Sequence, residues 1–219
     1  MSIQRRSKDA IAKRVAQDIQ EGMFVNLGIG LPTTVANHIP AGREIILHSE
    51  NGVLGMGPQP PAGEEDPDLI NAGKQPVTLR PGASFFHHAD SFGMIRGQHL
   101  DICVLGAFQV SVRGDLANWS TGGDAIPAVG GAMDLALGAK QVWVMMEHQT
   151  KSGGSKIVQE CTYPLTGVAC VTRVYTDLCV IDVTPQGLVA YDLVEGLDFD
   201  ALVQLTGVPL ARKGERAAV

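Results

Sequence analysis

Residues 44–57 read Glu44-Ile-Ile-Leu-His-Ser-Glu-Asn-Gly-Val-Leu-Gly-Met-Gly57, a short apolar run that ends in a carboxylate and a glycine-rich loop. The run over 44–49 has the length of a buried β-strand, and Asn51 with Gly52 predicts a turn after it. The carboxylate of Glu50 is therefore expected where an interior strand opens into a loop. We interpret it as a candidate nucleophile at the mouth of a cleft; a surface or salt-bridged carboxylate is the alternative.

A similar pattern occurs about twenty residues earlier, in Phe24-Val-Asn-Leu-Gly-Ile-Gly-Leu-Pro-Thr33. Pro32 suits the first turn of a helix, which is predicted to run to about His38. Gly28 and Gly30 allow the backbone to approach a ligand, and a helix N-terminus supplies unpaired N–H groups. We expect an anion-accepting turn here, with a ligand-free tight turn as the alternative, and we expect both glycine turns at the same edge of one sheet.

Apolar runs alternate with helical patterns along the rest of the chain. Helices are predicted over 7–21, 32–38, 132–139 and 198–205, and strands over 23–27, 44–49, 100–107, 141–147, 168–174, 177–183 and 188–193. Continuous apolar strands that alternate with helices indicate a sheet covered on both faces. The expected fold is α/β, with an open, largely parallel sheet and helices on both faces, in a single domain over residues 1–219.

Two further segments carry candidate site residues. The proline-rich stretch 57–76 is predicted to be an ordered loop that covers the site, because structureless loops of this length are uncommon. Within it, Lys74 is a candidate cation for a substrate carboxylate, with a simply solvated lysine as the alternative. Gly130 and Gly131 precede a predicted helix, where backbone N–H groups could form an oxyanion hole or merely begin the helix.

Composition excludes several classes of function. The chain has 219 residues with 17 basic and 23 acidic side chains, a net charge of −6, which argues against nucleic-acid binding. The spacing of the four cysteines favours free thiols. Neither a signal peptide nor a membrane-length apolar run is present, so a cytoplasmic location is expected, without membrane binding.

Resident metal and nicotinamide sites are also not expected. The pair His87-His88 has no His-Glu-x-x-His pattern around it and no cysteine nearby. The third glycine of a dinucleotide fingerprint is replaced by Thr33, which argues against a nicotinamide site. Ser49 lacks the flanking glycines of a nucleophile elbow, which argues against Ser-His-Asp catalysis.

Seven segments together resemble the B (beta) chain of the family I, or 3-oxoacid, CoA-transferases over nearly the whole sequence. Ser-Glu-Asn-Gly, at 49–52, resembles the active-site signature of that family. The segments are Asn26-Leu-Gly-Ile-Gly-Leu-Pro-Thr33, His48-Ser-Glu-Asn-Gly-Val-Leu-Gly-Met-Gly57, Leu69-Ile-Asn-Ala-Gly-Lys74, Gly114-Asp-Leu-Ala-Asn-Trp119, Gly130-Gly-Ala-Met-Asp134, Met146-Glu-His148 and Pro164-Leu-Thr-Gly167.

The resemblance implies a fold shared with ribose-5-phosphate isomerases, Glu50 as the nucleophile and the Gly131 N–H as an oxyanion donor. It implies a CoA thioester as substrate, no permanently bound cofactor, and a separate A (alpha) subunit in a hetero-tetramer. The remaining candidate contacts to substrate or CoA are Gly28, Gly30, Asn51, Gly52, Lys74 and Gly130.

Three segments indicate the substrate within the family. They are Phe85-Phe-His-His-Ala-Asp-Ser-Phe92, Gly106-Ala-Phe-Gln-Val-Ser-Val112 and Glu160-Cys-Thr-Tyr-Pro164. They most resemble the subunits that act on 3-oxoadipate, with succinyl-CoA:acetoacetate transferases as the alternative. An isomerase with Glu50 as general base, a non-catalytic sensing subunit and a thioester hydrolase remain as rivals.

Overall fold

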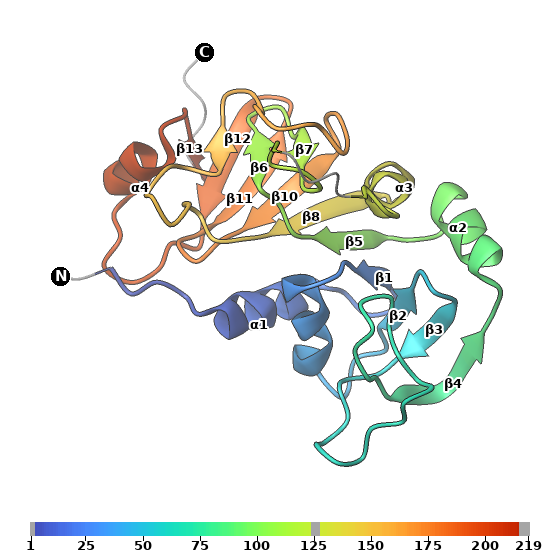
Figure 1. Ribbon diagram of the computed structural model, residues 1–219. Coiled ribbons are helices and arrows are strands. Elements are labelled where there is room, and N and C mark those ends of the chain that lie inside the picture. Colours follow the sequence, from blue (N-terminus) through green and yellow to red (C-terminus); the bar gives the residue numbers. More distant parts are fainter. Residues whose placement is uncertain (1–2, 124–127, 215–219) are drawn as a thin grey trace.

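A ten-stranded sheet forms the centre of the protein, in the order β13-β12-β11-β10-β8-β5-β1-β2-β3-β4 (Figure 1). The computed structural model describes residues 3–123 and 128–214. The strands of this sheet are β1 (Phe24–Leu27), β2 (Ile46–Ser49), β3 (Val53–Met56), β4 (Leu79–Phe85), β5 (Ile102–Leu105), β8 (Gln141–Met145), β10 (Val171–Tyr175), β11 (Val180–Thr184), β12 (Gly187–Tyr191) and β13 (Ala211–Arg212).

The sheet is parallel at its centre and antiparallel on its flanks. Strands β10, β8, β5, β1 and β2 run parallel to one another. Strands β3 and β4 continue one side as antiparallel hairpins, and β11 and β12 do so on the other. The predicted α/β fold is confirmed, whereas the flanking hairpins make the sheet mixed. A single domain over 1–219 stays a prediction.

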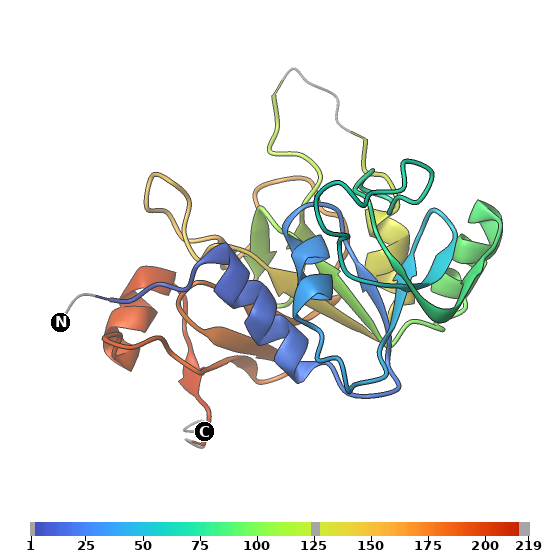
Figure 2. The ribbon, with the colours of Figure 1, turned by 90° about the horizontal axis from the view of Figure 1, so that it is seen from below.

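Helices cover both faces of the sheet, as Figures 1 and 2 show. Side chains alternate along β5, so that Ile102 and Val104 pack with α1 (Lys8–Asp18) and η1 (Leu31–His38). Cys103 and Leu105 point to the opposite face, which α3 (Ala132–Gly138) and α4 (Phe199–Thr206) cover. A second, three-stranded sheet lies on this same face and comprises β6 (Gln109–Ser111), β7 (Leu116–Ala117) and β9 (Ile157–Val158).

Local sequence signals explain where the helices begin and end. Ser7 accepts a hydrogen bond from the Ala10 N–H at 3.1 Å and caps α1, and Asp198 caps α4 in the same way. Gly207 ends α4 in the left-handed conformation, with φ 71°. The predicted helix from Pro32 is a 3₁₀ helix. The hydroxyls of residues 33 and 34 both bond carbonyls three residues back, which favours this tighter winding.

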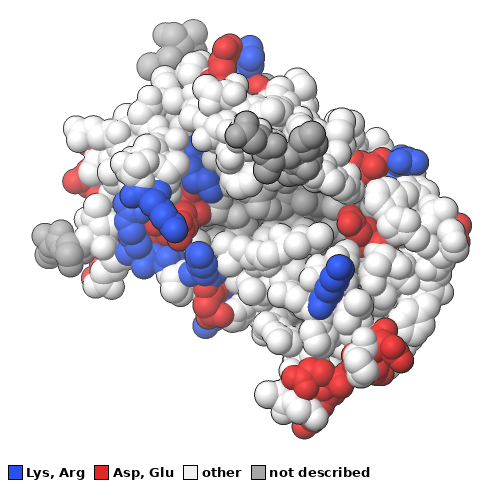
Figure 3. All heavy atoms as spheres, viewed as in Figure 1, with Lys and Arg blue, Asp and Glu red and all other residues white. Residues whose placement is uncertain are grey.

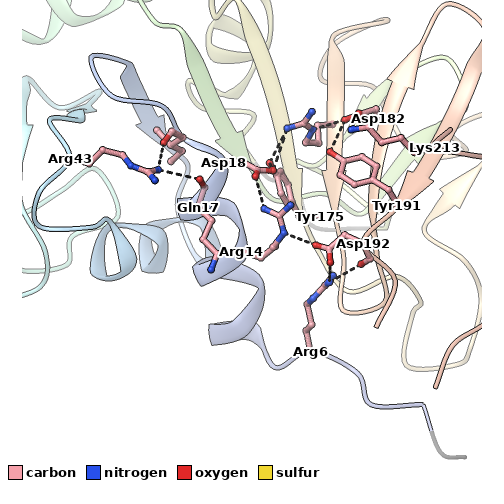
Figure 4. A network of polar contacts seen from close by, with 12 residues as sticks. Arg6, Arg14, Gln17, Asp18, Arg43, Tyr175, Asp182, Tyr191, Asp192 and Lys213 are labelled. Carbon is pink, nitrogen blue, oxygen red and sulfur yellow. Dashed lines mark hydrogen bonds and ion pairs between the residues drawn. The ribbon is translucent and has the colours of Figure 1, made fainter. Parts of the chain in front are cut away.

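A polar network joins α1 to the strands at one end of the sheet (Figure 4). Asp18 of α1 accepts a hydrogen bond from the Tyr175 hydroxyl at 2.8 Å and lies 3.4 Å from the Arg173 guanidinium. Arg14 bridges Asp18 and Asp192. The network therefore holds α1, which begins at Lys8, against the sheet.

None of the helices in the described parts of the chain is long and apolar enough to cross a membrane. The cysteines are free thiols, of which Cys103 and Cys179 are buried and Cys161 and Cys170 are half-buried.

Candidate active site

A cavity of about 540 Å³ opens at the carboxyl ends of the parallel strands. Gly28 follows β1, Glu50 follows β2, Gly106 follows β5 and Glu147 follows β8, and all four line it. The register, in which Asn26 pairs with both β2 and β5, brings these strand ends level. The expectation that both glycine turns lie at one edge of the sheet is thus confirmed. Ligands commonly bind outside the carboxyl ends of such strands.

Glu50 begins a three-residue turn between two antiparallel strands. Ser49 of β2 pairs with Val53 of β3, and the N–H of Gly52 donates to the Ser49 carbonyl at 2.9 Å. Gly52 has φ 109°, and a Cβ on it would overlap the carbonyl oxygen of Phe86. This turn therefore requires glycine, because other residues avoid that conformation and would lack the space.

The backbone of Glu50 is held from a second side. The Nδ1–H of His88, the first residue of α2 (His88–Arg96), donates to the Glu50 carbonyl at 2.9 Å. The His88 ring packs on Phe92 with centroids 4.8 Å apart. Together with the turn, this contact limits how far the Glu50 backbone can move.

The Glu50 carboxylate lies against Gly131, at the N-terminal end of α3. An ideal Cβ on Gly131 would be 2.5 Å from Oε2 of Glu50 and 3.0 Å from the Phe92 ring. Any side chain at 131 would therefore displace the carboxylate. In the part of the chain that the structure describes, no acceptor bonds the N–H of Gly131. This donor can face a negatively charged oxygen that forms beside Glu50.

Burial raises the pKa of the Glu50 carboxyl above its ordinary value. The charge of His88 opposes this shift, and the nearby Asp134 carboxylate adds to it. A half-buried carboxylate loses part of its hydration, so it is more reactive once ionised than one in bulk water.

A buried polar network supports the cavity wall. Asn26 is 2% exposed, and its amide nitrogen donates to Nδ1 of His48 at 3.0 Å. Burial lowers the pKa of His48 to about 4, so the ring is neutral and its Nε2–H donates to Ser91 at 2.9 Å. The side-chain amide oxygen of Asn26, Oδ1, is buried without a partner among the described residues, and Asn26 lines the cavity.

Sequence reasoning did not single out Asn26 as a site residue. The available signal was a lone polar residue inside the apolar run of β1, which needs partners if it is buried.

The structure brings some of the predicted site residues together and leaves others apart. Gly28, Gly130 and Gly131 line the same cavity as Glu50. A Cβ on Gly28 would be 2.9 Å from the Leu105 side chain, so this glycine permits close packing of β1 on β5.

Four predicted contacts lie outside the lining. Gly30, Asn51, Gly52 and Lys74 are not among the residues that line the cavity, and Lys74 is exposed in a turn at φ 61°. Their binding roles stay predictions.

The proline-rich segment is ordered and attached to the Glu50 turn. The Asn51 amide donates to the Ile70 carbonyl at 2.8 Å, and Ser49 accepts from the Ala72 N–H at 3.0 Å. Ala72 lines the cavity. The segment therefore borders the site on the side of the hairpin.

The far end of the cavity carries cations that the sequence did not reveal. Lys8 and Lys156 line the cavity, as do the apolar side chains of Phe108 and Trp119. Lys156 follows a Ser-Gly-Gly-Ser turn, which is typical of a solvated loop, so no local pattern marks it as a site residue. The described residues contain no cluster of three or more side chains suited to binding a metal.

Comparison with known proteins identifies the family. A family model described as Coenzyme A transferase matches residues 8–204. The B subunit of the 3-oxoadipate CoA-transferase of Pseudomonas putida is 67% identical over 207 residues, 94% of this chain and 97% of that protein. The B subunit of the succinyl-CoA:3-ketoacid coenzyme A transferase of Helicobacter pylori is 51% identical over 199 residues, 91% of this chain and 96% of that protein.

A solved structure supports the fold. The acyl-CoA transferase of Escherichia coli O157:H7 superimposes with a TM-score of 0.76 at 18% identity, over 98% of this chain and 43% of that one. Because the family model spans most of the sequence and the relatives align over nearly their whole length, the chain belongs to the coenzyme A transferase family.

Proposed function

We propose that the chain is the B subunit of a two-subunit enzyme that transfers CoA from succinyl-CoA to 3-oxoadipate through a thioester on Glu50. The observation that carries this proposal is the Glu50 carboxylate inside the cavity, so near Gly131 that a Cβ on that residue would be 2.5 Å from Oε2. The acceptor is inferred from the relative at 67% identity, which is named for 3-oxoadipate. The partner is inferred because both relatives are named as the B subunits of their enzymes.

A carboxylate nucleophile suits this reaction because an acyl-carboxylate anhydride keeps the activation of the thioester. In the first step, Glu50 attacks the carbonyl carbon of succinyl-CoA and the CoA thiolate leaves, giving a succinyl-glutamyl anhydride. The thiolate then attacks the glutamyl carbonyl, which forms the glutamyl-CoA thioester and releases succinate. The acceptor acid then undergoes the same two steps in reverse. Its carboxylate attacks the glutamyl-CoA thioester to give an anhydride and CoA thiolate, and the thiolate attacks the acyl carbonyl, which releases the new CoA ester and free Glu50.

Each addition passes through a tetrahedral oxyanion close to residue 131. The Gly131 N–H is available to donate to it, and one such donor is worth about 3 kcal/mol in a preorganised site. The apolar walls of the cavity, with Phe108 and Trp119, would exclude water from the anhydride. An anhydride open to solvent would hydrolyse, and the enzyme would then waste the thioester.

The test is steady-state transfer by the complex co-expressed with its A subunit. Succinyl-CoA is supplied with 3-oxoadipate, with acetoacetate or with no acceptor, and CoA esters and free thiol are measured. We expect transfer with the highest kcat/KM for 3-oxoadipate, little thiol release without acceptor, and loss of transfer in Glu50→Gln.

Each competing function gives a different result in this assay. A higher kcat/KM for acetoacetate than for 3-oxoadipate would change the proposed acceptor but leave the proposed CoA transfer in place. Thiol release independent of acceptor would indicate a hydrolase, and unchanged transfer in Glu50→Gln would remove Glu50 from the chemistry. Aldose–ketose conversion without any CoA exchange would favour the isomerase.

A further inference from the structure

We propose that Lys156 and Lys8 bind the pyrophosphate of CoA at the end of the cavity remote from Glu50. This inference rests on the proposed function, since it assigns the part of the donor that does not react. The two lysines come from distant parts of the sequence, and both line the cavity.

The fold brings together the two segments that carry these lysines. Lys156 follows the 147–155 loop, and its N–H donates to the His148 carbonyl at 3.0 Å. The segment that leads into Lys8 lies next to the same loop, because Arg5 bonds both Asp177 and Gln149 at 2.7 Å. Asp177 in turn accepts from the His148 N–H. The start of α1 and the 147–156 loop therefore meet at one end of the cavity.

Lys156 is a cation without a counter-ion. Among the described residues, no carboxylate lies within 4.0 Å of its ammonium group, although it is half-buried. Burial lowers the pKa of Lys156, while the more distant charges of Glu147 and Asp177 oppose that shift. A partly desolvated ammonium without a partner is unfavourable, and a bound anion would relieve that cost.

Several basic side chains lie near Lys156, together with the carboxylates of Glu147 and Asp177. Figure 3 shows Lys and Arg side chains gathered on one side of the hollow in this face. Lys151, in the same loop as Lys156, is exposed, and Arg5 lies beside the loop. Arg5 is paired with Asp177, whereas Lys151 and Lys156 have no ion pair among the described residues, so these two cations are available to a ligand with several negative charges.

The distance between the two ends of the cavity decides which anion fits. Strands β2, β1, β5 and β8 are consecutive neighbours, so three strand spacings, about 14 Å, separate the turn of Glu50 from the loop after β8. An extended chain advances about 1.2 Å per bond, so the roughly thirteen bonds from the CoA sulfur to its first phosphorus span about 15 Å. With the thioester at Glu50, the pyrophosphate reaches the lysines.

The carboxylate of the acyl group does not fit this position. The two carboxyl carbons of 3-oxoadipate are at most about 6 Å apart, by the same advance per bond. A substrate bound at Glu50 therefore leaves its second carboxylate well short of Lys156. The lysines thus contact the carrier and would not distinguish one acid from another.

The experiment compares three donors in the complete two-subunit complex: succinyl-CoA, succinyl-dephospho-CoA and succinyl-pantetheine. In Lys156→Gln, we expect kcat/KM to fall roughly 10- to 100-fold with the first two donors, as for loss of a charge-assisted contact. With succinyl-pantetheine, which lacks every phosphate, wild type and variant should agree within about twofold. Lys156→Arg should recover most of the loss, because it keeps the charge.

Lys13→Gln is the matched control, since Lys13 is exposed on α1 and does not line the cavity. It should leave kcat/KM unchanged with all three donors. An equal loss with succinyl-pantetheine, or no loss with any donor, would overturn the inference. A loss that disappears with the dephospho donor would move the contact to the 3′-phosphate and overturn the assignment to pyrophosphate.

Assembly of each variant with the A subunit and CoA transfer by the wild-type complex are measured in the same experiment. If Lys156→Gln does not assemble with its partner, Lys8→Gln at the exposed start of α1 applies the same comparison. If the wild-type complex transfers CoA from none of the donors, the proposed function itself fails. Transfer from all donors with no difference in the variants refutes this inference alone.

Discussion

Gly131→Ala should abolish most of the activity while leaving the fold intact. An added Cβ would lie 2.5 Å from Oε2 of Glu50, whereas ordinary contacts begin at 3.4 Å. The carboxylate must therefore retreat by about 1 Å, and a displacement of this size can cost about 10²-fold in rate. The backbone of Gly131, at φ −78° and ψ 0°, is accessible to alanine. We expect unfolding free energy within about 1 kcal/mol of wild type.

The assay is kcat for CoA transfer by the complex, alongside chemical unfolding of the isolated chain. We expect kcat to fall by about 10²-fold or more, because the Gly131 N–H is also moved relative to the oxyanion. Gly93→Ala is the matched control: Gly93 lies in α2, and a Cβ there would meet nothing within 4 Å. That variant should keep full kcat and gain slightly in stability. A Gly131→Ala enzyme with kcat within twofold of wild type would refute the steric argument.

Two further predictions concern pH. The acid limb of the pH profile of kcat/KM reports the ionisation of Glu50, whose pKa is raised by burial and by the Asp134 charge. Asp134→Asn should therefore shift that limb to lower pH. A limb that stays in place would show that the Asp134 charge does not raise the pKa of Glu50. His48 and His148 are both buried, and their pKa values are lowered to about 4. In the unfolded chain both rings have their ordinary pKa near 6.5, so below that pH the unfolded chain binds more protons than the folded chain. Stability should be fully present above that pH and fall as the pH drops toward 4, measured by urea unfolding; constant stability over this range would show that the two rings are not held neutral.

The parallel centre of the sheet could be predicted because its strands are continuous apolar runs. The strands of the β11–β12 hairpin could be predicted too, whereas β3 and β4 on the other flank were harder to recognise. Glycines at 52, 55 and 57 conceal β3, and Pro81 with Gly82 interrupts β4, so neither segment shows a strand pattern. The helix α2 was missed for a similar reason, since Gly93 lies in its middle. These elements form because neighbouring strands and α3 pack against them.

In the candidate site, too, some features could be predicted from the sequence and others depend on packing. Glu50 and the glycine turn of β1 could be placed at one sheet edge, because strand ends in a parallel sheet share an edge. The contact between Glu50 and Gly131 joins residues far apart in sequence, and only the packing of α3 creates it. Lys156 reaches the cavity because of how its loop folds against the start of α1. Spacing in one sequence carries no information on such contacts.

The central claim is that Glu50 carries CoA covalently, and peptide mass analysis tests it most directly. The co-expressed complex is incubated with succinyl-CoA without acceptor, quenched in acid and digested. We predict that the peptide containing Glu50 gains the mass of CoA less one water, loses it when 3-oxoadipate is added, and gains nothing in Glu50→Gln. An unmodified Glu50 peptide in a complex that is actively transferring CoA, or the same adduct on another residue, would contradict the account.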